Sequence, residues 1–236
     1  MESDVTQSAV FYKFWAWGET HRKQLLWGAI ILAAAGLAAG FFAWWQNEKE
    51  TSANNALSQA MDRPRLSNGQ GATSEALLKV AAEYPNTDAA GRAVLLAAAD
   101  LFAAGQYPQA QAQFDKYLRG YGGTPLTVQA LLGMAACLDI QGKTNEAITA
   151  YKNIYERYPN DNVVLQAKFA LARLYEVQNK LGEARDLYYN VSTNFSDSID
   201  SEAASLRYED LIAKHPELAP ATQASAKAPA AKLEKP

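Results

Sequence analysis

Three stretches of this chain align with one another at a fixed offset of 37 residues. The offset places small residues on small residues, rings on rings and turn formers on turn formers. The aligned sets are Ala98, Ala135 and Ala172; Gly105, Gly142 and Asn179; Ala110, Ala147 and Ala184; Phe114, Tyr151 and Tyr188; and Tyr121, Tyr158 and Phe195. Self-similarity at a period of about 20–50 residues is typical of a solenoid, in which each unit buries its apolar face by stacking on a neighbour.

Each repeat is predicted to be a pair of helices. The first helices are expected at 89–104, 126–141 and 163–178, and the second helices at 108–121, 144–158 and 181–195. Each first helix should end at Gly105, Gly142 or Asn179, because these residues suit the left-handed conformation of a helix C-cap. In each second helix the aligned alanine should face the partner helix, with the aligned ring one turn later on the same side. The predicted fold is all-α, with about three and a half helix pairs.

These units set the expected domain bounds. The repeat domain should cover 46–214, with a degenerate opening unit at 51–84, repeats at 85–121, 122–158 and 159–195, and a capping helix at 199–214. In the opening unit, a loop at 63–73 should precede a helix capped by Ser74. The segment 215–236 is rich in Ala, Pro and Lys and poor in apolar residues, so we predict a flexible, disordered tail.

An apolar span lies near the N-terminus. Residues 25–45 carry no formal charge, and a helix of that length covers roughly 30 Å, the thickness of a bilayer's hydrocarbon core. Trp27 and the pair Trp44 and Trp45 take the interfacial positions at its two ends. A buried core helix would need a larger protein around it. A cleaved signal peptide would have a shorter apolar region ending in small residues. The sequence therefore predicts an uncleaved transmembrane helix.

Flanking charges predict the orientation of that helix. Lys13, Arg22 and Lys23 precede the span, whereas Lys49 alone follows it closely. By the positive-inside rule, residues 1–24 should be cytoplasmic and residues 46–236 should lie across the membrane.

Charge and residue content exclude several classes of function. The chain has 22 Lys+Arg and 25 Asp+Glu, a net charge of −3, and no basic run outside the flank of the span, which argues against a nucleic-acid partner. Cys137 is the sole cysteine and is expected to be a buried structural thiol. His21 and His215, the only histidines, are too few and too far apart for a triad or a His-ligated metal site. No glycine-rich phosphate loop is present. We expect no enzyme, no cofactor and no small-molecule substrate.

One carboxylate pair is a possible exception. Asp139 and Glu176 occupy matching repeat positions and could face each other across a groove. Nothing apolar in the sequence surrounds both, so ordinary solvated charges are the favoured interpretation.

The aligned positions resemble the tetratricopeptide repeat. Ala98 and its equivalents match the small residue of the repeat's first helix, Ala110 and its equivalents the alanine of the second, and Phe114 and its equivalents the aromatic residue. Pro159 matches the closing proline. The chain departs from the pattern in its period, which is 37 rather than about 34, and in lacking a first-helix tryptophan.

The whole layout, over about residues 10–214, resembles the family of YfgM-type ancillary subunits of the bacterial SecYEG translocon. The domain model of that family also takes in the periplasmic cell-division coordinator CpoB. The resemblance implies a single-pass inner-membrane protein whose repeats act in the periplasm as a scaffold. Its partners would be translocon subunits, exported polypeptides or periplasmic chaperones. A scaffold for envelope assembly or cell division is the alternative.

In tetratricopeptide stacks the first helices line the concave face, which is therefore the candidate partner groove. Its expected residues are Arg92, Leu95, Ala99, Phe102, Gln129, Leu132, Ala136, Asp139, Gln166, Phe169, Arg173 and Glu176. An apolar floor with a polar rim suits extended or helical peptide segments, bound weakly and transiently. The alternative is that Leu95, Leu132 and Phe169 only pack between repeats.

Overall fold

The computed structural model describes residues 21–62, 73–194 and 198–219. Within these ranges the chain is helical and has no strand, as the repeat predicts. Residues 1–20 of the segment expected to be cytoplasmic, most of the expected loop 63–73, Phe195 and residues 220–236 of the expected tail lie outside the described residues. The chain divides into two compact units, Met1–Asn55 and Ala56–Pro236.

The first described helix, α2 (Arg22–Asp62), continues without a break from the first unit into the second. Its large apolar side chains described between Leu26 and Trp45 are exposed, including Trp27, Leu32 and Trp44. Of the helices that the structure describes, α2 alone is long and apolar enough to cross a membrane. In the second unit the same helix buries Leu57 and Ala60.

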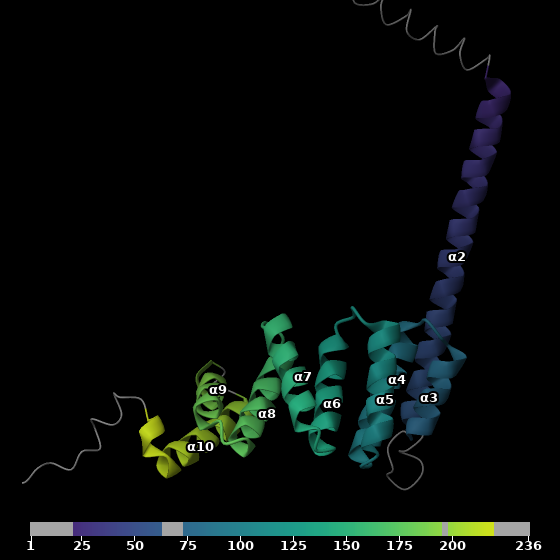
Figure 1. The fold of residues 1–236 in the computed structure, drawn as a ribbon. Coiled ribbons are helices and arrows are strands. Elements are labelled where there is room, and N and C mark those ends of the chain that lie inside the picture. Colours follow the sequence, from purple (N-terminus) through teal and green to yellow (C-terminus); the bar gives the residue numbers. More distant parts are fainter. Residues whose placement is uncertain (1–20, 63–72, 195–197, 220–236) are drawn as a thin grey trace, which may run out of the picture. The chain divides into compact units, whose positions relative to one another are not determined.

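The second unit is a row of helices in chain order (Figure 1). They are α3 (Ser74–Glu83), α4 (Asp88–Ala103), α5 (Tyr107–Tyr121), α6 (Thr127–Ile140), α7 (Thr144–Arg157), α8 (Val163–Val177), α9 (Leu181–Asn194) and α10 (Ile199–Lys214), followed by the short 3₁₀ helix η2 (Pro216–Leu218). From α3 onward each helix packs on the next, and α4, α6, α8 and α10 also contact one another in that order. These contacts are those of stacked helix pairs. The predicted bounds of the three pairs lie within one residue of the observed ones.

The core of each pair is the aligned alanine and the aligned ring of its second helix. Ala110, Ala147 and Ala184 are fully buried, and so are Tyr151 and Tyr188 to within a few per cent. A residue without a long side chain lets the two helices approach closely, and the ring one turn later fills the space beside the contact. The predicted role of these positions is confirmed.

The turns inside the three pairs have the same geometry. Gly105, Gly142 and Asn179 adopt positive φ angles of 76°, 74° and 58°. The residue after each donates its amide to the carbonyl five residues earlier, from Gln106 to Leu101 at 2.9 Å and from Lys143 to Leu138 at 3.0 Å. The third turn forms the equivalent bond at 2.8 Å. This is the hydrogen bond of a Schellman cap, and it confirms the predicted C-caps.

The start of α3 differs by one residue from the expectation. Its N-cap is Thr73, whose side chain accepts a hydrogen bond from the amide of Ala76, and Ser74 is the first helical residue. The amide of Ser74 instead donates to the carboxylate of Asp100 on α4, at 2.8 Å. The prediction of Ser74 as the cap was therefore wrong, because two adjacent hydroxyl residues are equally suited to that role.

The last helix, α10, has the character of a cap. It occupies the register of a first helix, but no second helix follows it in the described residues. Where α8 buries Leu165 and Ala172, α10 carries the exposed residues Glu202 and Glu209. A polar outer face is what a terminal repeat needs in water.

The described residues extend a short way past the end of α10, to Ala219. Leu218 in η2 packs on the last core cluster, and its carbonyl accepts a hydrogen bond from the guanidinium of Arg185 at 2.9 Å. These residues fall in the segment 215–236, which the sequence suggested as tail.

Candidate partner-binding face

The row of first helices α4, α6 and α8 carries the residues expected to form the groove. Five of them are exposed, namely Arg92, Ala99, Gln129, Gln166 and Arg173. The others are half-buried, namely Leu95, Phe102, Leu132, Ala136, Asp139, Phe169 and Glu176. The face therefore exposes amide and guanidinium groups, and exposes its larger apolar side chains in part.

The half-buried apolar side chains also pack within the stack. Leu132 lies against the core cluster that joins α6, α7 and α8. The ring of Phe169 meets the ring of Tyr188 edge-on, with centroids 5.7 Å apart. Phe102 makes a similar contact with Tyr107 at 5.3 Å. Part of each of these side chains therefore packs inside the stack, and the rest of its surface is accessible to solvent.

The two matching carboxylates have different partners. Asp139 forms an ion pair with Arg173, which joins α6 to α8; the side chain of Asp139 is 13% exposed and that of Arg173 51%. Glu176 accepts a hydrogen bond from the hydroxyl of Tyr188 on α9, at 3.1 Å. The structure therefore gives each acid a structural contact of its own rather than a shared role in acid–base chemistry.

Each acid also acts on the buried phenol of its own helix pair. Burial, and then the carboxylate of Glu176, raise the pKa of Tyr188. Burial, and then the carboxylate of Asp139, raise the pKa of Tyr151 at the matching position of the middle pair. In the first pair, phenylalanine occupies both the ring position and the acid position. A helix pair with a tyrosine at the ring position thus has a carboxylate at the acid position, and the pair with phenylalanine has none. This is expected if a buried hydroxyl donor requires a nearby acceptor.

Sequence reasoning missed one row of exposed residues on this face. Ile140 and Val177 are 49% and 75% exposed, and they end α6 and α8 one turn after Ala136 and Arg173. Their equivalent in α4 is Ala103. The sequence contained the signal for this row, because Ile140 and Val177 lie four residues after Ala136 and Arg173 and 37 residues from each other.

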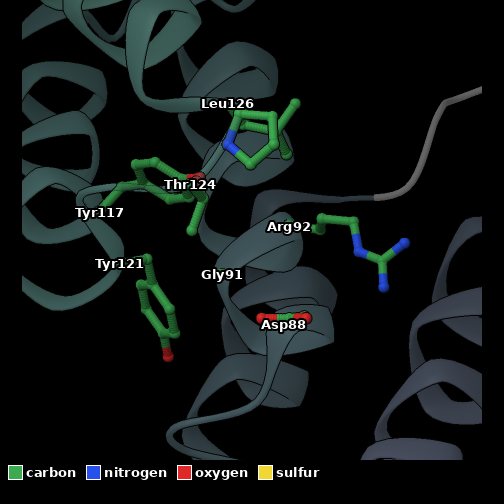
Figure 2. Close-up of a pocket in the computed structure, with 8 residues that line it drawn as sticks. Asp88, Gly91, Arg92, Tyr117, Tyr121, Thr124 and Leu126 are labelled. Atoms are coloured by element: carbon green, nitrogen blue, oxygen red, sulfur yellow. The ribbon is translucent and has the colours of Figure 1, made fainter.

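A cavity of about 320 Å³ opens between α4, the end of α5 and the connection to α6. It is lined by Asp88, Gly91, Arg92, Tyr117, Tyr121, Thr124, Pro125 and Leu126. In Figure 2 the two tyrosines stand opposite the start of α4, and the side chain of Arg92 extends away from them. Arg92 is the one expected groove residue that lines this cavity.

One residue that lines the cavity is a glycine where the later repeats have a buried side chain. Gly91 occupies the position of Val128 and Leu165, which are 5% and 7% exposed in the later repeats. A Cβ atom on Gly91 would lie 2.9 Å from the ring of Tyr121, so this ring takes the place that a side chain at position 91 would need.

The thiol does not supply reactivity. Cys137 is buried, as predicted, and burial raises its pKa to about 11, so the thiol stays protonated near neutral pH. Among the described residues, no group of three or more His, Cys, Asp or Glu side chains could hold a metal ion.

Stacked helix pairs with aligned small and aromatic residues, and a surface made by the first helices, define the class of tetratricopeptide-like solenoids. The family model described as "Tetratricopeptide repeat-like domain" matches residues 13–211. The chain therefore belongs to this family. A comparison with curated proteins finds no match.

Several solved structures align with this chain at low sequence identity. A tetratricopeptide repeat protein from Parabacteroides merdae aligns with a TM-score of 0.54 at 13% identity, over 72% of this chain and 63% of that one. The nearly identical TPR-like repeats of a putative kinesin light chain from Podospora anserina align with a TM-score of 0.50 at 15% identity, over 73% and 88%. PcrH from Pseudomonas aeruginosa aligns with a TM-score of 0.46 at 16% identity, over 54% and 92%.

Proposed function

We propose that this chain is a membrane-anchored scaffold for protein–protein interactions. The observation that carries the proposal is the face of α4, α6 and α8, where exposed amides and guanidinium groups adjoin partly accessible apolar side chains. Solenoids of this family use such extended surfaces to hold other proteins. The fold is typically non-catalytic, and the acids on the face already have structural partners.

The proposed anchor is the apolar part of α2. Residues 25–45 would span a bacterial inner membrane, with residues 1–24 in the cytoplasm and the repeat domain 46–214 in the periplasm. The length of the uncharged run, the exposure of its apolar side chains and the excess of Lys and Arg before it support this arrangement.

The proposed process is protein export. In this proposal the chain is an accessory of the Sec translocon, and its repeats link exported polypeptides to periplasmic chaperones. The resemblance of the whole layout to YfgM-type subunits supports it. The alternative, a role in envelope assembly or division, has the same architecture and differs only in its partners.

Co-purification of the full-length chain from membranes in mild detergent tests the proposal. Translocon subunits with exported precursors are expected; a chain ending at Asp62, which keeps α2 and lacks α3 to α10, is the control and should recover neither. Recovery of outer-membrane assembly or wall-synthesis proteins instead would favour the alternative role in envelope assembly or division over the export role. Recovery of the same proteins with both chains would contradict a scaffold role for the repeats.

A further inference from the structure

We infer that the face of the first helices binds an amphipathic α-helix of a partner protein, which carries an acidic side chain where it crosses α8. The inference rests on the proposed function, because it assigns the bound helix to a protein held by the repeats. It deepens that function by naming the conformation and the chemistry of the bound segment.

The exposed large apolar side chains of the described repeats gather on one set of helices. Between residues 73 and 219 they are Leu96, Ile140, Val177, Tyr189, Ile199 and Leu206. All of them except Tyr189 belong to α4, α6, α8 or α10, the helices in the register of a first helix. Several exposed apolar side chains on one face mark a surface for another protein, whereas single ones need no explanation.

The face continues onto α10. Leu211 of α10 is buried in the last core cluster, as Leu174 of α8 is in the cluster before it. The two helices therefore turn the same side toward the stack, and Leu206 lies on the same side as Phe169, its equivalent 37 residues earlier. Leu206 is 63% exposed on a helix whose other exposed side chains are mostly charged. A partner that covers the face can therefore bury this leucine.

Apolar side chains of the first helices form two rows across the stack. The central row consists of Leu95, Leu132, Phe169 and Leu206, and the end row consists of Phe102, Ile140 and Val177. Two turns of helix separate the rows, or roughly 10–12 Å along each first helix. An α-helix with its side chains has a diameter of about 10–12 Å, so one helix laid across the first helices can contact both rows.

The surface between the rows favours a helix over an extended chain. On α4 and α6 it is made by Ala99 and Ala136, whose side chains have no hydrogen-bonding group. An extended segment held between the rows would leave backbone N–H and C=O groups without partners, which costs free energy. A helix satisfies those groups internally and needs only apolar side chains toward the rows.

The charge on α8 favours an acidic side chain in the bound helix. Arg173 occupies the position of the two alanines and pairs with Asp139. The arginine is the outer member of that pair, since its side chain is 51% exposed and that of the aspartate 13%. Glu176 is half-buried and accepts the hydroxyl of Tyr188. A carboxylate of the partner can therefore accept hydrogen bonds from the guanidinium donors that Asp139 does not use.

The stack also sets the length of the bound helix. Packed helices have axes about 8–10 Å apart, so α4, α6, α8 and α10 together span roughly 24–30 Å from the first axis to the last. A helix of about 16–20 residues covers that distance and meets the next first helix about every two turns.

The test measures the binding of labelled peptides to the full-length protein in lipid nanodiscs by fluorescence anisotropy, with empty nanodiscs as the reference. The parent peptide is a helix of about 18 residues with one stripe of leucines, alanine and glutamine elsewhere, and a glutamate at each end of the stripe. We expect saturable binding of this peptide to the protein.

Two altered peptides test the charge and the conformation. Lysine in place of both glutamates should weaken binding about twofold to fivefold, the factor expected for an exposed ion pair. Proline in the centre of the peptide should weaken binding at least tenfold, because proline breaks a helix and leaves an extended chain able to bind.

Three variants of the protein locate the peptide on the face. The double variant Ile140→Gln with Val177→Gln removes exposed apolar groups of the end row and should weaken binding of the parent peptide about tenfold or more. Arg173→Gln should bring the affinities of the glutamate and lysine peptides together. The control Tyr189→Gln changes an exposed apolar side chain on a second helix and should leave all affinities unchanged. Circular dichroism checks that each variant keeps its helices.

The outcomes separate this inference from the proposed function. Absence of saturable binding of the parent peptide, a proline peptide that binds as tightly, or a lysine peptide that binds the unaltered protein equally well overturns the inference. Unchanged binding to the variant at positions 140 and 177 also overturns it. Partners recovered by co-purification would then still support the scaffold. Saturable, variant-sensitive binding without any recovered partner would keep the helix-binding face and remove the proposed function.

Discussion

The buried phenol of Tyr188 limits what can stand at the acid position of its helix pair. Its hydroxyl donates to Glu176, and a donor buried without an acceptor loses the hydrogen bond it had with water. Asp139, which raises the pKa of Tyr151, occupies the same position in the middle pair. Of the acids that the sequence suggested as groove charges, Glu176 is therefore tied to a core residue and Asp139 to Arg173, so the exposed polar groups that a partner meets first are those of Arg92, Gln129, Gln166 and Arg173.

Replacing the acceptor should cost stability only while the phenol is present. We expect Glu176→Leu to destabilise the fragment 47–236 by about 1–3 kcal/mol, because the hydroxyl of Tyr188 is left without its partner. Combined with Tyr188→Phe, the same change should cost less, with a coupling of about 1 kcal/mol or more between the two sites. Urea unfolding of the four proteins in the cycle, followed by circular dichroism, measures the coupling. If the losses of stability of the two single variants add up to that of the double variant, the proposed link between Glu176 and Tyr188 is wrong.

Buried phenol and thiol groups predict a loss of stability at high pH. Burial raises the pKa of Cys137 to about 11 and raises the pKa of Tyr188. Because each folded-state pKa lies above its unfolded value, the contribution is complete below that unfolded value, near pH 9–10, and is lost as the pH rises.

The urea midpoint of the fragment 47–236 should therefore be lower at about pH 10.5 than at pH 8, with each group contributing at most about 1.4 kcal/mol per pH unit. The double variant Cys137→Ala with Tyr188→Phe should show a smaller drop. A wild-type midpoint that holds constant or rises over this interval would show that these groups titrate alike in both states.

At the scale of single helices, α6 depends on a glycine in its middle. A Cβ atom on Gly133 would lie 2.3 Å from the tip of the Phe114 ring, which is buried in the contact between α5 and α6. The third pair has a slightly larger residue here, Ala170 in α8. The glycine in α6 thus lowers the helix propensity of the middle pair but allows the Phe114 ring of the first pair to pack closely.

Gly133→Ala should lower the stability of the fragment 47–236 although alanine favours helices. Overpacking costs about 1–3 kcal/mol, whereas the gain in helix propensity is about 1 kcal/mol. The control Gly120→Ala, in a helix with open space around the site, should be neutral or stabilising. Thermal melts of both variants decide the sign. A stabilised Gly133→Ala protein would mean that the Phe114 ring moves aside freely.

Helix bounds were predictable because the turn residues repeat with the period of 37. Gly105, Gly142 and Asn179 predict left-handed helix caps, and all three residues have positive φ angles in the structure. The extent of exposure was not predictable, since Leu132 and Phe169 are half-covered by side chains from the neighbouring helices. The cavity was not predictable either, because it depends on how α4, the end of α5 and the connection to α6 pack together.

At the scale of the whole molecule, the proposed orientation can be checked directly. If Lys13, Arg22 and Lys23 hold the N-terminus in the cytoplasm, alkaline phosphatase fused after Ala219 should be active, and the same enzyme fused before Phe11 should be inactive. Moving the positive charge to the other flank, with Arg22→Ala, Lys23→Ala and added lysines after Trp45, should weaken or reverse the pattern. An active N-terminal fusion in the unaltered chain would contradict the periplasmic assignment of the repeats.

The central claim is that the first helices, and not the second, hold the partner. The direct measurement is photo-crosslinking of the full-length chain in membranes, with a benzophenone side chain at exposed positions. Gln129 and Gln166 share one repeat position on the first helices, and Glu146 and Glu183 share another on the second helices. Adducts with other proteins from Gln129 and Gln166, and few or none from Glu146 and Glu183, are expected. Equal adducts from both pairs, or adducts only from Glu146 and Glu183, would contradict the account.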